Sequence, residues 1–343
     1  MTFQGRCRAT GIGSFACPDP AEALDLVFEF CPQLPYLPQL SKRSRLEGMN
    51  EQMYEGLPGL VQRNGKWLII QDEAFFLAVD RLFQEAEQPA PTSGAMSPDR
   101  AAALAPFLQR LRESGVPEGK AQVSGPVTVG MSIVDEQGIP ALYNDVLREV
   151  IVTHLALKVR WLTAQLEAAG VRPIIFVDEP FLASFGTPFF AWTRPEQPRD
   201  AIEHVYAAAP IRGTHCCGNT DWSIFLLSSV HIISFDAFGY APNFLTARDD
   251  LVTFIRRGGN IAWGIVPTDP DDLAASTPDG LVDRLRTLID KLAGYGLDRQ
   301  AILRQSLITP ACGLGTRPHE IARPACHAAA AIAHTLQTED LQP

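Results

Sequence analysis

The stretch GIGSF, residues 11–15, follows the first apolar run of the chain and distinguishes between two α/β folds. An open doubly wound sheet commonly carries the phosphate-binding motif G-x-G-x-x-G directly after its first strand. GIGSF lacks that spacing, Pro18 and Pro20 soon follow it, and no Walker A sequence occurs elsewhere in the chain. The sequence therefore favours a closed (β/α)8 TIM barrel over an open doubly wound sheet.

Beyond this stretch, short apolar runs alternate with longer helical patterns, which is typical of a parallel sheet built from βαβ units. Eight strands are predicted, at residues 9–14, 67–71, 121–124, 174–177, 211–215, 232–235, 260–265 and 307–309. Helices are predicted between them, at residues 20–30, 98–114, 142–169, 199–208, 221–228, 244–257, 279–295 and 318–337. Because barrels of this kind commonly take chains of this length, we expect residues 1–343 to form a single barrel domain. The proline-rich segment 31–66 is predicted to be an insertion after the first strand that forms a lid.

The charge of the chain argues against some classes of partner. Its net charge is −10 and its pI about 5.2, so neither nucleic acid nor an anionic membrane surface is an expected partner. No apolar stretch approaches the roughly 20 residues of a membrane span, and the N-terminal residues lack a signal-peptide pattern. The expected location is cytoplasmic, where the cysteines would stay reduced as free thiols or metal ligands.

Reactive side chains gather where the predicted strands end. In a barrel, chemistry collects at the carboxyl ends of the strands. The residues found at or just after these ends are Ser14, Glu73, Asp178, Glu179, His215, Cys217, Asp236 and Cys312. Packing does not account for this distribution, because buried charges are costly unless a partner meets them. Asp178 and Glu179 are adjacent and are the predicted catalytic carboxylates.

The stretch THCCGNT, residues 214–220, places two thiols beside a histidine. His215 and Cys217 are two residues apart, so on a strand they point to the same side. Cys312, after the last strand, lies across the mouth of the barrel and can supply a second thiolate. One imidazole and two thiolates suit tetrahedral Zn²⁺, with Asp236, a water or a substrate atom as the fourth ligand. The remaining cysteines are expected to be packing residues: Cys7, Cys17, Cys31, Cys216 and Cys326.

Together these residues resemble the catalytic barrel of the cobalamin-independent methionine synthase family. That family shares a barrel superfamily with uroporphyrinogen decarboxylase and the methylcobalamin:coenzyme M methyltransferases. The matching stretches are GIGSF at 11–15, SGPVT at 124–128, VDEP at 177–180, HCCGN at 215–219 and TPACGLGTR at 309–317. The last two are the most specific. The resemblance covers nearly the whole chain and implies a barrel with a catalytic zinc.

The resemblance also implies a role for single residues. The implied zinc ligands are His215, Cys217 and Cys312. Asp236 stands where the family has a glutamate as the fourth ligand, although its side chain is one methylene shorter. Ser14 and Asp178 match residues that contact the carboxylate and the amino group of homocysteine. Glu73 falls where the family has a glutamate at the end of its second strand.

The implied reaction is a zinc-dependent transfer of a methyl group to a thiol, with homocysteine as the first choice of acceptor and methionine as the product. Zinc would lower the pKa of the thiol, so that its sulfur attacks as a thiolate. Full-length enzymes of the family have two barrels and this chain has room for one, so a methylated corrinoid protein is the expected donor. The alternatives are a methyltransferase for another thiol or methylated compound, a non-catalytic zinc- or thiol-binding protein, and a zinc hydrolase with Glu179 as general base.

Overall fold

Seven parallel strands form the central sheet of the structure, a computed structural model that describes residues 3–89 and 92–342. Their order is β1-β9-β8-β7-β6-β5-β4, so β1 and β9, the first and the last of these strands along the chain, are neighbours. The strands are β1 (Arg8–Ala9), β4 (Glu118–Ser124), β5 (Arg172–Asp178), β6 (Ile211–Cys216), β7 (Ile232–Phe235), β8 (Asn260–Val266) and β9 (Ser306–Pro310). Their residues are almost all buried, as expected for parallel strands covered by helices.

Residues 35–39 close the ring between β1 and β4. The amide of Leu37 donates to the carbonyl oxygen of Lys120 at 2.9 Å, and the amide of Gln39 donates to the carbonyl oxygen of Gly13 at 2.9 Å. The bridges on both sides are parallel, so this segment occupies the position of the second barrel strand. The prediction of an α/β barrel is therefore confirmed.

The predicted second strand, residues 67–71, lies outside this ring. Residues Lys66–Ile69 form β3, which pairs antiparallel with β2 (Leu60–Arg63) in a separate two-stranded sheet. Asn64 and Gly65 connect the two strands with φ values of 50° and 77°, as a two-residue hairpin turn requires. The segment is extended as predicted, but its assignment to the barrel is wrong.

Two prolines account for the irregular shape of the true second strand. Pro35 and Pro38 have no amide hydrogen to donate, so the segment cannot form a full ladder with its neighbours. The interval predicted to be an insertion, residues 31–66, therefore contains a barrel strand position. The extra elements follow it. The hairpin among them packs on the loop after helix Pro126–Ser132, where the amide of Ile69 donates to the carbonyl oxygen of Val134 at 3.0 Å.

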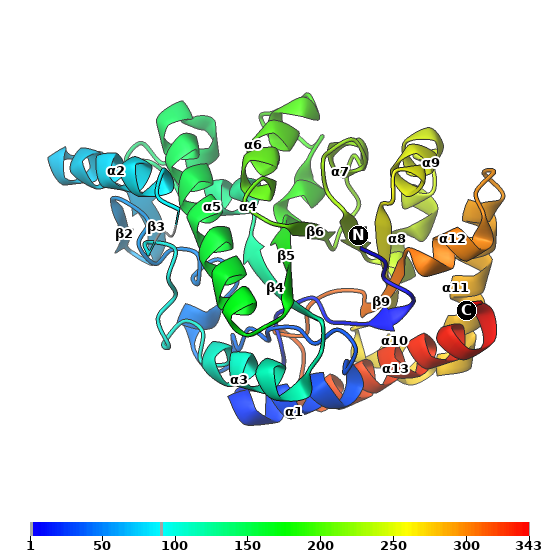
Figure 1. Cartoon of the computed structure of the whole chain (residues 1–343). Helices are drawn as coiled ribbons and strands as arrows, with labels where there is room; N and C mark the ends of the chain where they lie inside the picture. The colour runs from blue at the N-terminus through cyan, green and yellow to red at the C-terminus, as the bar shows by residue number, and fades with distance from the viewer. Residues whose placement is uncertain (1–2, 90–91, 343) are drawn as a thin grey trace.

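Helices cover the outside of the barrel (Figure 1). The α-helices are α1 (Pro20–Phe30), α2 (Glu73–Ala86), α3 (Leu104–Ser114), α4 (Pro126–Ser132), α5 (Asp145–Ala168), α6 (Glu196–Tyr206), α7 (Ser223–Leu226), α8 (Ala237–Phe244), α9 (Arg248–Arg256), α10 (Pro270–Ala275), α11 (Pro278–Ala293), α12 (Arg299–Arg304) and α13 (Ala322–Thr335). Shorter turns are η1 (Arg45–Glu47), η2 (Ala141–Tyr143), η3 (Pro180–Ser184), η4 (His319–Ile321) and η5 (Leu336–Asp340). Within the described ranges, no helix combines the length and apolar character needed to cross a membrane.

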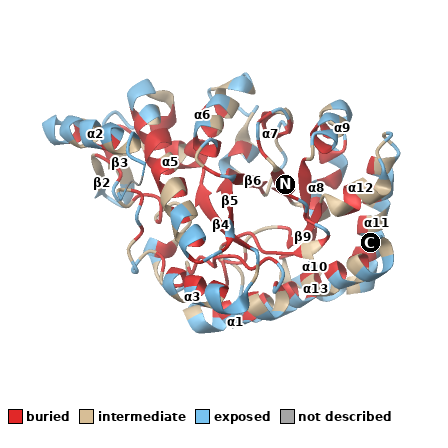
Figure 2. Cartoon of the chain, viewed as in Figure 1, coloured by how far each residue is buried: buried red, intermediate tan, exposed pale blue. Residues whose placement is uncertain are grey.

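Alternation along each strand divides the buried residues into two layers. Ile174 and Phe176 of β5 belong to a small cluster with alternate residues of β6 to β9, which fills the barrel interior. Ile175 and Val177 belong to the large cluster between the sheet and the helices. Figure 2 shows the buried strands at the centre and the exposed outer faces of the helices. Side chains on β5 in step with Phe176 therefore point into the barrel, and those in step with Val177 point outward.

Candidate metal and substrate site

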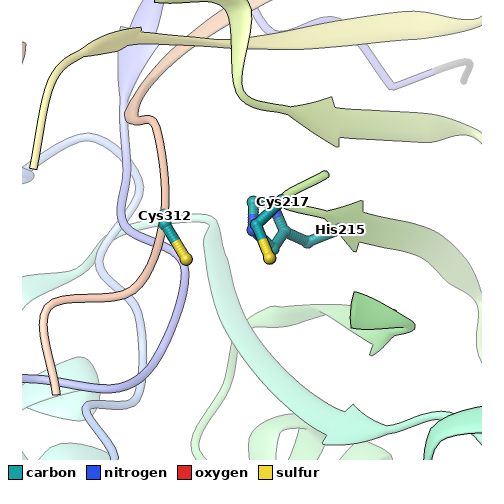
Figure 3. A group of neighbouring side chains, drawn as sticks. All are labelled: His215, Cys217 and Cys312. Carbon is teal, nitrogen blue, oxygen red and sulfur yellow. The ribbon is translucent and has the colours of Figure 1, made fainter. Parts of the chain in front are cut away.

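Three side chains from two strand ends meet at the mouth of the barrel. His215 lies on β6 and Cys217 directly follows it, while Cys312 lies in the loop after β9. One nitrogen and the two sulfur atoms all lie within 4.8 Å of one another. Figure 3 shows Cys312 facing His215 and Cys217 from a separate segment of the chain. The structure thus brings together three of the four residues that the sequence predicted as metal ligands.

The imidazole of His215 is held in an orientation that suits metal binding. Its Nδ1 lies 3.0 Å from the hydroxyl oxygen of Ser234 on β7. Its Nε2 is buried and has no hydrogen-bond partner within the described part of the chain. An unpartnered buried polar atom costs about 1–3 kcal/mol, and a cation bonded to this nitrogen would offset that cost. The donor set and the free nitrogen therefore fit a soft divalent ion.

The thiols of Cys217 and Cys312 interact, and this interaction shifts their pKa values in opposite directions. Accepting from Cys312 lowers the pKa of the Cys217 thiol below its usual value. The same hydrogen bond, together with burial, raises the pKa of Cys312 well above its usual value. The two thiols therefore lie close enough to affect each other's ionisation, in the place where a cation would bind both thiolates.

Asp178 lies beside this cluster inside the barrel. It is the register partner of His215 across β5 and β6, and it follows Phe176 by two residues, so its side chain points inward. Its Oδ1 is buried without a hydrogen-bond partner in the described residues. Burial raises the pKa of the carboxyl to about 6, although the charges of Lys120 and His215 oppose that shift. Asp178 is therefore a buried carboxyl with one unpartnered oxygen, and it lies directly opposite the ligand His215 on the neighbouring strand.

Lys120 is a functional candidate that the sequence reading missed. It lies on β4 with its side chain in the barrel, where Nζ donates to the carbonyl oxygen of Ile12 at 2.6 Å and lies 4.3 Å from the ring centre of Phe176. Burial lowers the pKa of its amine to about 8, and the charge of Asp178 opposes that shift. The predicted strand began at residue 121, so Lys120 fell outside it. Alternation extended back from Gln122 would have found it.

Two glutamines line the second strand position, where the sequence predicted an insertion. Gln39 donates from Nε2 to Oε1 of Gln52 at 2.7 Å, and Gln122 donates from Nε2 to the carbonyl oxygen of Leu37 at 3.0 Å. Both side chains lie against Gly13, where an added Cβ would be 2.7 Å from Cδ of Gln122 and 2.9 Å from Oε1 of Gln39. The second glycine of GIGSF is thus required by the close approach of two buried amides.

Ser14 contacts the loop that carries Cys312. The amide of Leu314 donates to the carbonyl oxygen of Ser14 at 2.7 Å, and the amide of Gly315 lies 3.4 Å from the Ser14 hydroxyl. An added Cβ at Gly313 would lie 2.1 Å from that hydroxyl, so only glycine allows the loop to pass so closely. Ser14 therefore borders the loop of the cluster. It lies beyond the end of β1 at Ala9, in a single parallel bridge to Gln39, so the predicted first strand at residues 9–14 extended too far.

Glu179 has a structural role that differs from the predicted catalytic one. It accepts hydrogen bonds from the amides of Val127 and Thr128 at 2.9 and 2.7 Å, and from the Thr128 hydroxyl at 2.6 Å. Both carboxylate oxygens are thus occupied at the N-terminus of α4, outside the barrel interior. Burial raises its pKa to about 7, although these hydrogen bonds oppose the shift. Adjacent residues on a strand point to opposite faces, which explains why Asp178 and Glu179 separate.

Asp236 does not join the three ligands. Its side chain caps α8, where Oδ1 accepts from the amide of Gly239 at 2.6 Å. It is not part of the group whose ligand atoms lie within 4.8 Å of one another. The structure therefore leaves the fourth position of the predicted tetrahedron without a protein ligand among the described residues.

Glu73 is not at the end of a barrel strand. It is an exposed residue in the first turn of α2, after the separate β2–β3 hairpin. Its predicted match with a glutamate at the end of the second strand rested on the wrong strand, because residues 35–39 hold that position. Gln39 is the polar residue that does lie there.

Residues 98–335 of the chain match the family described as the cobalamin-independent synthase, catalytic domain. This range is well over half of the chain. The chain belongs to this family. Membership makes the protein a methyltransferase of the methionine synthase type. The part of the chain that matches the synthase family contains Lys120, Asp178 and the three clustered ligands, whereas Ser14 and Gln39 precede it.

Two solved structures are similar to this synthase-family chain. One is a B12-independent methionine synthase from Shewanella sp. W3-18-1 in complex with selenomethionine, with 18% identity and a TM-score of 0.46 over 68% of this chain and 67% of that one. The other is an uncharacterised protein with 11% identity and a TM-score of 0.24, over 72% of this chain and 51% of that one. A search of curated proteins gave no match.

Proposed function

We propose that the protein transfers a methyl group to the sulfur of a small amino-acid thiol, with homocysteine as the first acceptor and methionine as the product. The observation that carries this proposal is the grouping of His215, Cys217 and Cys312 within 4.8 Å. Asp178, an unsatisfied buried carboxyl, is the register partner of His215 on the neighbouring strand. The site thus pairs a soft metal-binding set with an acceptor for a substrate amine.

The cofactor in this proposal is Zn²⁺, held by Nε2 of His215 and by the sulfur atoms of Cys217 and Cys312. Two thiolates and one imidazole suit zinc and disfavour hard cations such as Mg²⁺. When bound, zinc supplies a Lewis acid that lowers the pKa of an acceptor thiol to near neutrality. Asp236 caps a helix instead of completing the set, which leaves room for a substrate sulfur.

The side chains of the protein orient the substrate in this proposal. Asp178 binds the amino group of the thiol substrate, and Ser14 contacts its carboxylate. Lys120 keeps Asp178 ionised by its charge, since it opposes the rise in the pKa of that carboxyl. Holding the sulfur in line with the methyl group converts an encounter into a reactive geometry. The sequence predicts a lid at residues 31–66. Because residues 35–39 hold a strand position and the hairpin begins at Leu60, residues 40–59 of that interval are the proposed lid.

The methyl donor is a separate part of the proposal. The resemblance of the CGN stretch, Cys217 to Asn219, to corrinoid-using methyltransferases makes methylcobalamin the first donor to test and a methylfolate the second. Another thiol is the second candidate acceptor, because the three metal ligands select a sulfur and do not by themselves select the rest of the substrate. A panel of thiols assayed with each donor separates these possibilities.

Replacing Cys312 with Ala tests the proposed function directly. We expect zinc content to fall from one equivalent at this cluster to none and methyl transfer to fall at least about 1,000-fold, because one of three ligands is removed. Zinc is measured by elemental analysis, and turnover by methionine formation from methylcobalamin and homocysteine.

The matched control is Cys326→Ala, which changes a buried cysteine of α13 outside the cluster. It should retain both zinc and turnover. A Cys312→Ala protein that is folded and fully active would refute the proposed function.

A further inference from the structure

A second group of metal-binding side chains lies on the rim of the barrel. Cys17 precedes α1, Glu22 lies in the first turn of α1, and His319 lies in η4. One ligand atom from each lies within 4.8 Å of the other two. These residues are separate from the cluster of His215, and the sequence reading had assigned Cys17 to packing.

We propose that Cys17, Glu22 and His319 form a second site for a thiophilic divalent cation, with Zn²⁺ as the best match. A thiolate, a carboxylate and an imidazole are three donors that zinc accepts in one tetrahedral site. Ligand atoms bonded to zinc at about 2.0–2.3 Å lie about 3.5 Å apart, so the observed spacing needs only small side-chain movements.

The carboxylate of Glu22 already joins the other two groups. Nε2 of His319 lies 2.8 Å from its Oε1. The Cys17 sulfur lies within 4.8 Å of a Glu22 carboxylate oxygen, and burial with the nearby charge of Glu22 raises the pKa of that thiol to about 12. A cation would take the place of the thiol proton and of the His319–Glu22 contact: the S–H bond breaks, its proton passes to solvent, and an S–metal bond forms.

The surroundings favour a cation and give it access. Glu22 and His319 line a surface cavity of about 250 Å³, with Asp25 and Glu320 on its wall. Arg323, which also lines the cavity, is paired with Glu29 at 2.9 Å. Of the three ligands, Cys17 is buried, whereas Glu22 and His319 are exposed, so the site has one fixed and two adjustable donors.

The position of this site connects it to the loops of the methyltransferase site. Cys17 and Ser14 lie on the same loop after β1, and His319 and Cys312 follow β9 on the same segment. A cation shared by Glu22 and His319, which are 297 residues apart in the chain, would fix these two loops together. The entropy lost when a loop is closed grows with the length of the loop. A metal that links residues far apart in the chain therefore stabilises a fold most.

The test uses the full chain with both cluster thiols changed, Cys217→Ser and Cys312→Ser, so that only the rim site can bind zinc through a thiolate. We expect this protein to bind one equivalent of Zn²⁺ in competition with a chromophoric chelator. Added Co²⁺ should give a thiolate-to-cobalt absorption band from a single sulfur. Adding Cys17→Ser should abolish the band, and adding His319→Gln should abolish the zinc equivalent.

His334→Gln is the matched control, because it changes another exposed histidine of the same C-terminal region and should leave zinc binding intact. In the otherwise unaltered protein, His319→Gln should lower total zinc from two equivalents to one. A single equivalent that Cys312→Ala removes would overturn the rim site and leave the proposed function standing. Two equivalents without methyl transfer would support the rim site and refute the proposed function.

Discussion

At the scale of single residues, alternation along the strands decides which side chains take part in the chemistry. His215 and Cys217 could be predicted to point the same way because they are two residues apart, and the structure shows them together. The same rule separates Asp178 from Glu179, yet the sequence alone does not show that Glu179 meets the amides of α4. Lys120 escaped prediction because a lysine at the start of an apolar run is read as a strand boundary.

Asp178→Asn tests the binding of a substrate amine. A hydrogen bond to a charged group contributes about 1.5–3 kcal/mol, so the KM for homocysteine should rise about 10- to 100-fold while zinc content is unchanged. Because the pKa of Asp178 is raised to about 6, protonation at lower pH removes its charge. The wild-type KM should therefore rise as the pH falls through about 6, and this rise should be absent from the variant.

Asp236→Asn is the control for this prediction, because asparagine also serves as an N-cap and should keep α8 intact. It should change neither zinc content nor KM. Loss of zinc from Asp178→Asn would show that Asp178 belongs to the metal site. Loss of zinc from Asp236→Asn would show that Asp236 is the fourth ligand after all.

At the scale of elements, the second barrel strand marks where the sequence reading failed. Seven of the predicted strands lie in the barrel, because their apolar runs are bounded by turn residues and buried on both faces. Residues 35–39 carry two prolines and few β-branched residues, so no local pattern distinguishes them from a loop. The hairpin was recognisable from Asn64-Gly65, a turn signal that should have separated residues 67–71 from the barrel.

Glu179→Gln tests the cap on α4 at this scale. The pKa of Glu179 is raised from 4.5 to about 7 in the folded protein. Its protonation therefore stabilises the fold below about pH 4.5, and that contribution is lost as the pH rises through about 7. Glutamine does not titrate and places an NH₂ group against amide donors, so the variant should be less stable than wild type at pH 5. The difference in the free energy of unfolding should shrink by pH 8.

Urea unfolding at both pH values measures this difference, and turnover of the folded variant should stay within a few-fold of wild type. A variant with unchanged stability but no methyl transfer would show that Glu179 is a catalytic residue.

At the scale of the whole molecule, the metal cluster links β6 to the loop after β9 and so spans the two sides of the barrel mouth. A ligand that binds only the folded state stabilises it by mass action, by about 2.7 kcal/mol at 100 times its Kd. Removing zinc with a chelator should therefore lower the Tm of the wild-type protein by about 4 °C, because the unfolding entropy of a chain of this length is large. The protein with Cys217→Ser, Cys312→Ser and His319→Gln should show no such change, and an equal decrease in that variant would exclude both metal sites as the cause.

The prolines of the second strand position have a consequence for the motions of the barrel. With Pro35 and Pro38 unable to donate, residues 35–39 form fewer backbone hydrogen bonds with β4 than β5 does on the other side of that strand. Amide protons of Leu37 and Gln39 should exchange with solvent deuterium earlier than those of β5 and β6. Transient parting of the wall at this place would loosen the segment that carries Gln39 while the seven strands of the sheet stay intact.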